Sequence, residues 1–194
     1  MRFRVFAFCV WLLVAAGTFL FASGLLDFWE SHHAQSEIAS EWSGHSPQES
    51  LPEGRIPEGS PVAKLYIPRL NAEFYVVEGT DAESLKRGPG HLEGTVMPGQ
   101  GGNCVIAGHR DTHFRVLKDV RNGDEIILQR DGREFRYRVD GSQIVMPTNT
   151  QSLQPTRDAV LHLVTCYPFY YLGSAPKRFI VRAGLENTSL SASR

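Results

Sequence analysis

From Val62 to Gly184 the sequence is a series of short runs rich in β-branched and aromatic residues, separated by turn residues. This pattern is typical of an all-β barrel or sandwich and not of alternating strand–helix units. Strands are expected at 62–67, 73–77, 90–93, 103–108, 125–130, 134–145, 159–166 and 177–183. Because about eight strands are enough to close a barrel, we predict one all-β barrel domain over residues 62–184.

Short helices and one tight turn are expected between these strands. Asp81 can cap a short helix that ends by Gly88, and Asp111 or Thr112 can cap another helical turn. Asp131-Gly132 separates two strand-like runs and suits the positive φ angles of a tight hairpin turn.

The chain begins with an uncharged apolar segment, residues 5–26. About 22 residues at a rise of about 1.5 Å are enough to cross a hydrocarbon core of about 30 Å. Arginines precede this segment and acidic residues follow it, so the positive-inside rule puts residues 1–4 in the cytoplasm. We therefore predict a single-pass anchor in the cytoplasmic membrane, with the body in the periplasm or at the cell surface. A cleaved signal peptide is the alternative, because residues 22–24 are small.

Two polar segments flank the barrel domain. Residues 27–61 are rich in Glu, Ser, Pro and Gly, and the prolines from Pro47 onward exclude a long helix there. We predict an extracytoplasmic linker, with at most a weakly indicated helix over 27–42. Residues 185–194 are expected to form a disordered tail.

Composition excludes several classes of protein. The formal net charge of −1 excludes a basic patch large enough to make nucleic acid a partner. Three cysteines are too few for a disulfide framework, and no Cys/His cluster has the spacing of zinc ligands. We therefore expect no metal and no other cofactor.

Cys166 is the candidate nucleophile. It ends an apolar strand, and Pro168 then forces a turn, so the thiol is expected at the accessible end of the sheet. His109 follows the strand at 103–108 and can move protons, and Gly108 allows close backbone approach beside it. Arg178 begins the last strand, where a permanent cation can stabilise an oxyanion.

Other residues compete for these roles. His113 lies four residues beyond His109, and His162 shares the face of Cys166 but lies about 13 Å back along the strand. Strand alternation is expected to point the Cys104 side chain into the core. Arg110 and Asp111 can tune His109 but stay outside the predicted catalytic set. The aromatic residues between 167 and 171 are equally consistent with a peptide groove and with packing.

Three stretches in the body, 103–114, 163–169 and 175–181, strongly resemble the motifs of the sortase family and occur in its order. The run Thr165-Cys166-Tyr167-Pro168-Phe169 is most similar to class D sortases. The resemblance covers about residues 63–183 and includes the stretch 64–68. It implies a closed barrel of about eight strands that cleaves a C-terminal LPxTG-like sorting signal through a thioacyl intermediate.

The resemblance also implies roles and partners. Cys166, His109 and Arg178 would be the catalytic residues, and Thr165 would help to hold the substrate. The acyl group would pass to an amine on a cell-wall precursor or another protein, so that surface proteins are anchored or pili assembled. Two rival hypotheses stay open: a non-catalytic envelope protein that binds peptides or acts as a scaffold, and a cysteine peptidase that only hydrolyses.

Overall fold

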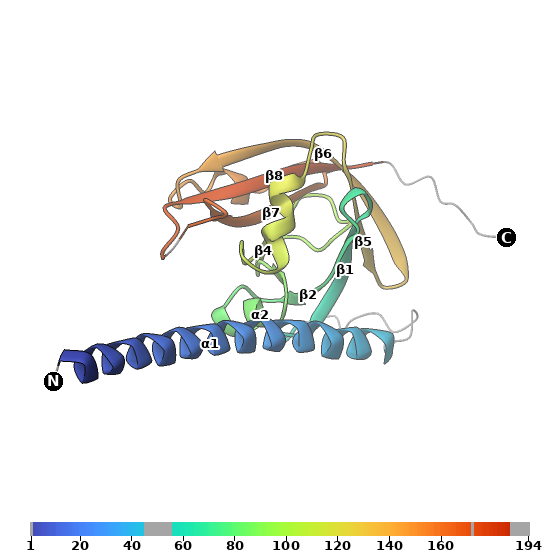
Figure 1. The fold of residues 1–194 in the computed structure, drawn as a ribbon. Coiled ribbons are helices and arrows are strands. Elements are labelled where there is room, and N and C mark those ends of the chain that lie inside the picture. Colours follow the sequence, from blue (N-terminus) through green and yellow to red (C-terminus); the bar gives the residue numbers. More distant parts are fainter. Residues whose placement is uncertain (1, 45–55, 172, 187–194) are drawn as a thin grey trace.

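The computed structural model describes residues 2–44, 56–171 and 173–186, with the side chains of residues 2–10, 23–32 and 44 left out (Figure 1). The predicted linker between 45 and 55 and the tail from 187 onward lie outside these ranges. The elements are α1 (Arg2–Gly44), β1 (Pro61–Ile67), η1 (Pro68–Leu70), β2 (Ala72–Glu78), α2 (Ala82–Arg87), β3 (Gly90–His91), β4 (Asn103–Gly108), η2 (His113–Asp119), β5 (Glu125–Arg130), β6 (Arg133–Val145), η3 (Gln151–Leu153), β7 (Val160–Tyr167) and β8 (Lys177–Leu185).

The eight strands form a closed barrel in the order β1-β2-β3-β4-β7-β8-β6-β5, and β5 pairs with β1 to close it. This confirms the predicted all-β barrel. Two neighbouring pairs, β2·β3 and β4·β7, are parallel. Parallel neighbours need a crossover connection, and the segment between β4 and β7 contains η2, β5, β6 and η3. The β4·β7 pair therefore joins two parts of the chain that are distant in sequence.

The predicted hairpin turn joins β5 and β6. Asp131 and Gly132 have φ angles of 50° and 71°, which is the left-handed conformation that such turns require. Along β6, Tyr137 and Val139 are buried in the core while Arg136 and Arg138 are exposed. Turn chemistry and strand alternation thus fix the register of this hairpin.

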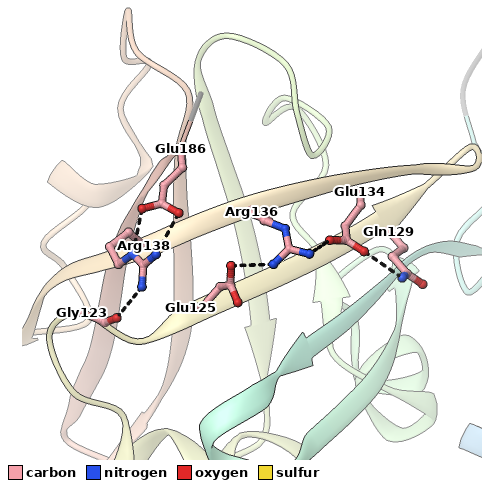
Figure 2. Close-up of polar contacts among 7 residues, drawn as sticks. All are labelled: Gly123, Glu125, Gln129, Glu134, Arg136, Arg138 and Glu186. Carbon is pink, nitrogen blue, oxygen red and sulfur yellow. Dashed lines mark hydrogen bonds and ion pairs between the residues drawn. The ribbon is translucent and has the colours of Figure 1, made fainter. Parts of the chain in front are cut away.

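The exposed side of β6 carries ion pairs to β5 and to the residue that follows β8 (Figure 2). Arg136 Nη1 lies 2.9 Å from Glu125 Oε1. Arg138 donates to both carboxylate oxygens of Glu186, at 2.8 and 3.0 Å, and to the carbonyl oxygen of Gly123. Exposed pairs of this kind contribute about 1 kcal/mol or less each, so burial of apolar side chains inside the barrel is the larger stabilising term.

Two local predictions need correction. The predicted strand 90–93 is only two residues long, because the chain turns where Thr95 N donates to Leu92 O. The short strand is held instead by the buried His91, whose Nδ1 lies 2.8 Å from Glu78 Oε2. At η2, Thr112 is the N-cap residue but makes no capping hydrogen bond with its side chain. The cap of α2 by Asp81 is as predicted.

Helix α1 extends further than the sequence indicated, because it continues through the first half of the predicted linker to Gly44. The residues from 27 to 44 contain no proline, since the first proline of the linker is Pro47. Among the residues that the structure describes, no helix has both the length and the hydropathy needed to cross a membrane.

The C-terminal third of α1 packs against the barrel beside β1, β2 and α2 (Figure 1). Gln35 Oε1 accepts from Tyr75 N at 2.9 Å, and Gln35 Nε2 donates to the carbonyl oxygens of Tyr75 and Arg87 at 3.2 and 2.7 Å. Ile38 is fully buried, and the rings of Trp42 and Tyr75 lie 6.5 Å apart. This part of α1 is therefore a component of the barrel domain.

Replacing Ile38 by alanine is expected to loosen this contact, because a buried isoleucine truncated to alanine costs about 2–5 kcal/mol. Hydrogen exchange of the amides at 33–43 should become faster in the variant. Ser40→Ala is the matched control, since Ser40 is exposed on the same helix. Equal exchange rates in the two variants would contradict the docking of α1.

Candidate active site

The three candidate catalytic residues come from adjacent strands β4, β7 and β8. In the parallel pair, Gly108 is in register with Thr165, so His109 and Cys166 both follow as the next residues. In the antiparallel pair, Cys166 lies directly opposite Arg178. Neighbouring strands are about 4.8 Å apart. The backbone therefore sets the ends of these three strands in one row, with Cys166 opposite Arg178 and His109 directly after the end of β4.

Cys166 lies on the outer face of the barrel. Leu163 and Thr165, which alternate with Cys166 along β7, are 0% and 2% exposed, and Leu163 is part of the hydrophobic core. Because successive side chains of a strand point to opposite faces, Cys166 points away from the core, and its side chain is half-buried. This agrees with the predicted accessible position at the end of the strand.

The backbone on both sides of His109 is held in place. Thr165 Oγ1 donates to Gly108 O at 2.7 Å, and Phe114 N donates to His109 O at 2.9 Å. A Cβ atom added to Gly108 would lie 2.7 Å from the Phe114 ring, so the close approach expected at this glycine is present. These contacts fix the direction in which His109 leaves β4.

Thr165 faces the barrel interior, and its hydroxyl is engaged by Gly108 O. In this arrangement the side chain links the Cys166 strand to the residue before His109. A direct contact between Thr165 and substrate stays a prediction from the sequence.

Arg178 is held by the loop that precedes β8. Its Nη1 donates to Ala175 O at 3.3 Å and to Lys177 O at 3.0 Å. A guanidinium has five N–H donors, so donors remain that can turn to a substrate carbonyl. The competing basic residues lie elsewhere: Arg182 is opposite His162 and pairs with Asp140, and Lys177 is opposite Tyr167, one residue out of phase.

The two competing histidines are buried. His113 is 7% exposed, and burial lowers its pKa to about 4, with a further contribution from His109. His162 is 5% exposed, its Nδ1 lies 2.7 Å from Asn103 Oδ1, and burial lowers its pKa as well. Both side chains stay neutral near pH 7. His109 is half-buried and is therefore more accessible to a substrate than either of them.

The lowered pKa of His113 makes stability depend on pH. Its ordinary value near 6.5 applies to the unfolded chain, which therefore binds a proton more readily between pH 6.5 and about 4. The contribution of the neutral, buried His113 to the free energy of unfolding is complete above pH 6.5 and is lost as the pH falls. We expect the free energy of unfolding to be about 2 kcal/mol smaller at pH 5 than at pH 7 from this residue alone.

Urea unfolding of the wild type and of His113→Phe at both pH values measures this dependence. Phenylalanine keeps an aromatic ring against Phe74, which contacts His113 edge-on, but it binds no proton. The variant should lose less stability on acidification. An identical loss in the two proteins would contradict the role of His113.

Cys104 is not a second nucleophile. It is 1% exposed, and burial raises the pKa of its thiol to about 12. Because the thiolate is the reactive form of cysteine, Cys104 is inert near neutral pH. The predicted inward orientation of this side chain is confirmed.

The aromatic residues after Cys166 were predicted either to line a peptide groove or to pack against the barrel, and they differ in their surroundings. Phe169 packs on Phe179, with ring centroids 5.4 Å apart, and Tyr167 stacks on Phe179 at 6.4 Å. Tyr170 and Tyr171 are 70% and 48% exposed. The first two are packing residues, and the last two belong to the surface loop between β7 and β8.

One contact of this loop could not be found from the sequence. Arg110, next to His109, donates to the carbonyl oxygens of Tyr171 and Gly173. A loop contact of this kind carries no periodicity or motif. Within the described ranges, no group of three or more His, Cys, Asp or Glu side chains is placed to hold a metal ion.

The chain is similar in sequence to known proteins. The Sortase domain model matches residues 65–186. Sortase D of Bacillus subtilis is 42% identical over 119 residues, which cover 60% of this chain and 60% of that protein. The match thus spans about three fifths of the relative's length.

Solved structures resemble the fold as well. A Clostridium perfringens Sortase D5 transpeptidase has a TM-score of 0.68 and 26% identity, with 80% of this chain and 98% of that chain covered. The catalytic domain of Bacillus anthracis SrtD has a TM-score of 0.60 and 34% identity, with 71% of this chain and 95% of that chain covered.

Proposed function

We propose that this chain, which belongs to the sortase family, is a cysteine transpeptidase that cleaves an LPxTG-like sorting signal and transfers the acyl group to an amine. The observation that supports the proposal is the strand register: Gly108 and Thr165, which precede His109 and Cys166, are paired, and Cys166 is paired with Arg178. Its substrates would be proteins with a C-terminal sorting signal, and the amine would belong to a cell-wall precursor or another protein.

In the first half-reaction, Cys166 Sγ attacks the carbonyl carbon of the scissile peptide bond. His109 takes up the thiol proton and delivers it to the leaving amine, which is the harder part of amide cleavage. Arg178 donates to the oxyanion of the tetrahedral intermediate. The peptide C–N bond breaks, and the acyl group stays on Cys166 as a thioester.

In the second half-reaction, the incoming amine attacks the thioester carbonyl. His109 removes a proton from the amine and returns one to the departing thiolate. The products are a new amide and the free Cys166 thiol, so no oxidant, reductant or metal enters the balance. Water in place of the amine would give hydrolysis, which is the reaction of the rival peptidase.

The test incubates the full chain with a labelled LPxTG-type peptide, with and without an amine acceptor. We expect an adduct on Cys166 by intact-mass and peptide-mapping mass spectrometry, and a ligated product that depends on the amine. Absence of any adduct would favour the non-catalytic binding protein. An adduct that yields only hydrolysed peptide with every amine tested would favour the peptidase.

Attachment to the cytoplasmic membrane is the second part of the proposal, and it is supported by the uncharged residues 5–26 alone. The expected result is a full-length protein in the membrane fraction that alkaline carbonate leaves in place and detergent extracts. A mature form of lower mass that needs no detergent would favour the signal-peptide alternative.

A further inference from the structure

The loop between β7 and β8, residues 168–176, is described at 168–171 and 173–176; it begins two residues after Cys166 and ends two residues before Arg178. Arg178 Nη1 donates to the carbonyl oxygens of Ala175, in this loop, and of Lys177, the first residue of β8. A change in the loop would therefore alter the position of the Arg178 guanidinium.

Arg110 connects the same loop to the end of β4, the strand that precedes His109. Arg110 Nη2 donates to Tyr171 O at 2.7 Å and to Gly173 O at 2.9 Å, and its guanidinium carbon lies 5.8 Å from the centroid of the Tyr171 ring. The Nη1 atom is buried and has no hydrogen-bond partner among the described residues. Arg110 is thus half-buried, with its Nη1 atom covered and its Nη2 bonds to the loop exposed.

Arg110 is also the residue next to His109, whose backbone is held by Phe114 N. One side chain therefore links the backbone beside His109 to the loop that holds Arg178. A second contact supports the same loop, because Lys118 Nζ donates to Tyr170 Oη at 3.0 Å. Lys118 reaches a side-chain hydroxyl, whereas Arg110 donates to two backbone carbonyls, so of these two residues Arg110 is the one that holds the backbone of the loop.

We propose that Arg110 is a positioning residue, which fixes the 168–176 loop against the end of β4 and so keeps Arg178 aligned with His109 and Cys166. The inference rests on the proposed transpeptidase function. Arg110 itself touches no reacting atom. Its loss leaves Cys166 and His109 in place but lets the loop, and Arg178 with it, leave the geometry that oxyanion stabilisation requires.

The expected consequence is a slower chemical step with little change in substrate binding. Small misplacements of catalytic groups can cost up to about 100-fold in rate. We expect the acylation rate of Arg110→Ala to fall about 10-fold, with KM within about twofold of wild type. Arg110→Lys keeps a cation with three donors, so its acylation rate should lie between those of the wild type and Arg110→Ala.

The experiment uses the full chain and follows acyl-enzyme formation on Cys166 by rapid-quench mass spectrometry. Hydrogen exchange at the Tyr170 and Tyr171 amides is measured in parallel and should become faster in Arg110→Ala. Arg138→Ala is the matched control, because Arg138 also donates to a loop carbonyl, that of Gly123 (Figure 2). Arg138 lies on β6 and pairs with Gly184, at the opposite end of β8 from Arg178. Arg138→Ala should acylate like the wild type.

Three results would overturn the inference: wild-type acylation in Arg110→Ala, a slow Arg110→Ala without faster exchange at Tyr170 and Tyr171, or no recovery in Arg110→Lys. Arg110→Lys also keeps the test decisive if the alanine variant folds poorly, since a loss of rate in a lysine variant of unchanged melting temperature has no purely structural cause. A wild type that forms no acyl-enzyme would refute the proposed function first, and the positioning role with it.

Discussion

A Cys166→Ala variant is expected to form no acyl-enzyme and to lose at least about 1,000-fold in the rate of peptide cleavage. Alanine has no atom that can bond to the substrate carbonyl, and no neighbouring thiol can replace it, because Cys104 lies inside the barrel and its pKa is raised to about 12. Rates of cleavage and intact mass after incubation with an LPxTG-type peptide measure the effect.

The same variant should fold normally. Cys166 is half-buried at the end of β7, so the loss of its sulfur leaves the core intact and the melting temperature close to that of the wild type. Cys104→Ala is the matched control: it should be less stable, because Cys104 is part of the core, yet acylate at an unchanged rate when folded. Retained cleavage by Cys166→Ala, or loss of acylation in folded Cys104→Ala, would refute the assignment.

The second large effect is expected for His109→Ala, whose rate of acylation should fall by about 100- to 10,000-fold. The variant keeps the thiol but lacks the group that moves the proton from sulfur to the leaving amine. Steady-state kinetics with the labelled peptide and thiol alkylation measure the two properties separately. We expect Cys166 to remain open to alkylation while peptide cleavage is lost.

His113→Phe is the control for this prediction. His113 lies in the same segment, but it is buried and its lowered pKa keeps it neutral near pH 7. A folded His113→Phe protein should therefore cleave the peptide at close to the wild-type rate. If His113→Phe were inactive and His109→Ala active, His113 would be the proton carrier.

Local signals in the sequence predict most of the barrel. Strand alternation places Tyr137 and Val139 in the core, and Asp131-Gly132 adopts the positive φ angles of its turn. The same alternation separates Cys104, which points inward, from Cys166, which points outward. These features depend on neighbouring residues only, and their physical causes are therefore visible in a short window of sequence.

Features that depend on distant contacts are not visible in this way. The short strand β3 ends at the turn in which Thr95 N donates to Leu92 O and is held by the buried pair of His91 and Glu78, and no periodicity reveals either contact. The docking of α1 depends on Gln35. Its side-chain amide bonds to the backbone N–H and carbonyl of Tyr75, as a neighbouring strand would do. The register between His109 and Cys166 needs the β4·β7 pairing, which the motifs of the site imply only through a family resemblance.

The parallel pairing of β4 with β7 has a consequence for the newly made chain. β5 and β6 lie between these strands in sequence, and β8 is the last strand to be synthesised. Until all of them have taken their places, Cys166 is an ordinary thiol with neither imidazole nor guanidinium beside it. We therefore expect a nascent chain to lack the proposed activity, because only the completed barrel brings the ends of β4, β7 and β8 together.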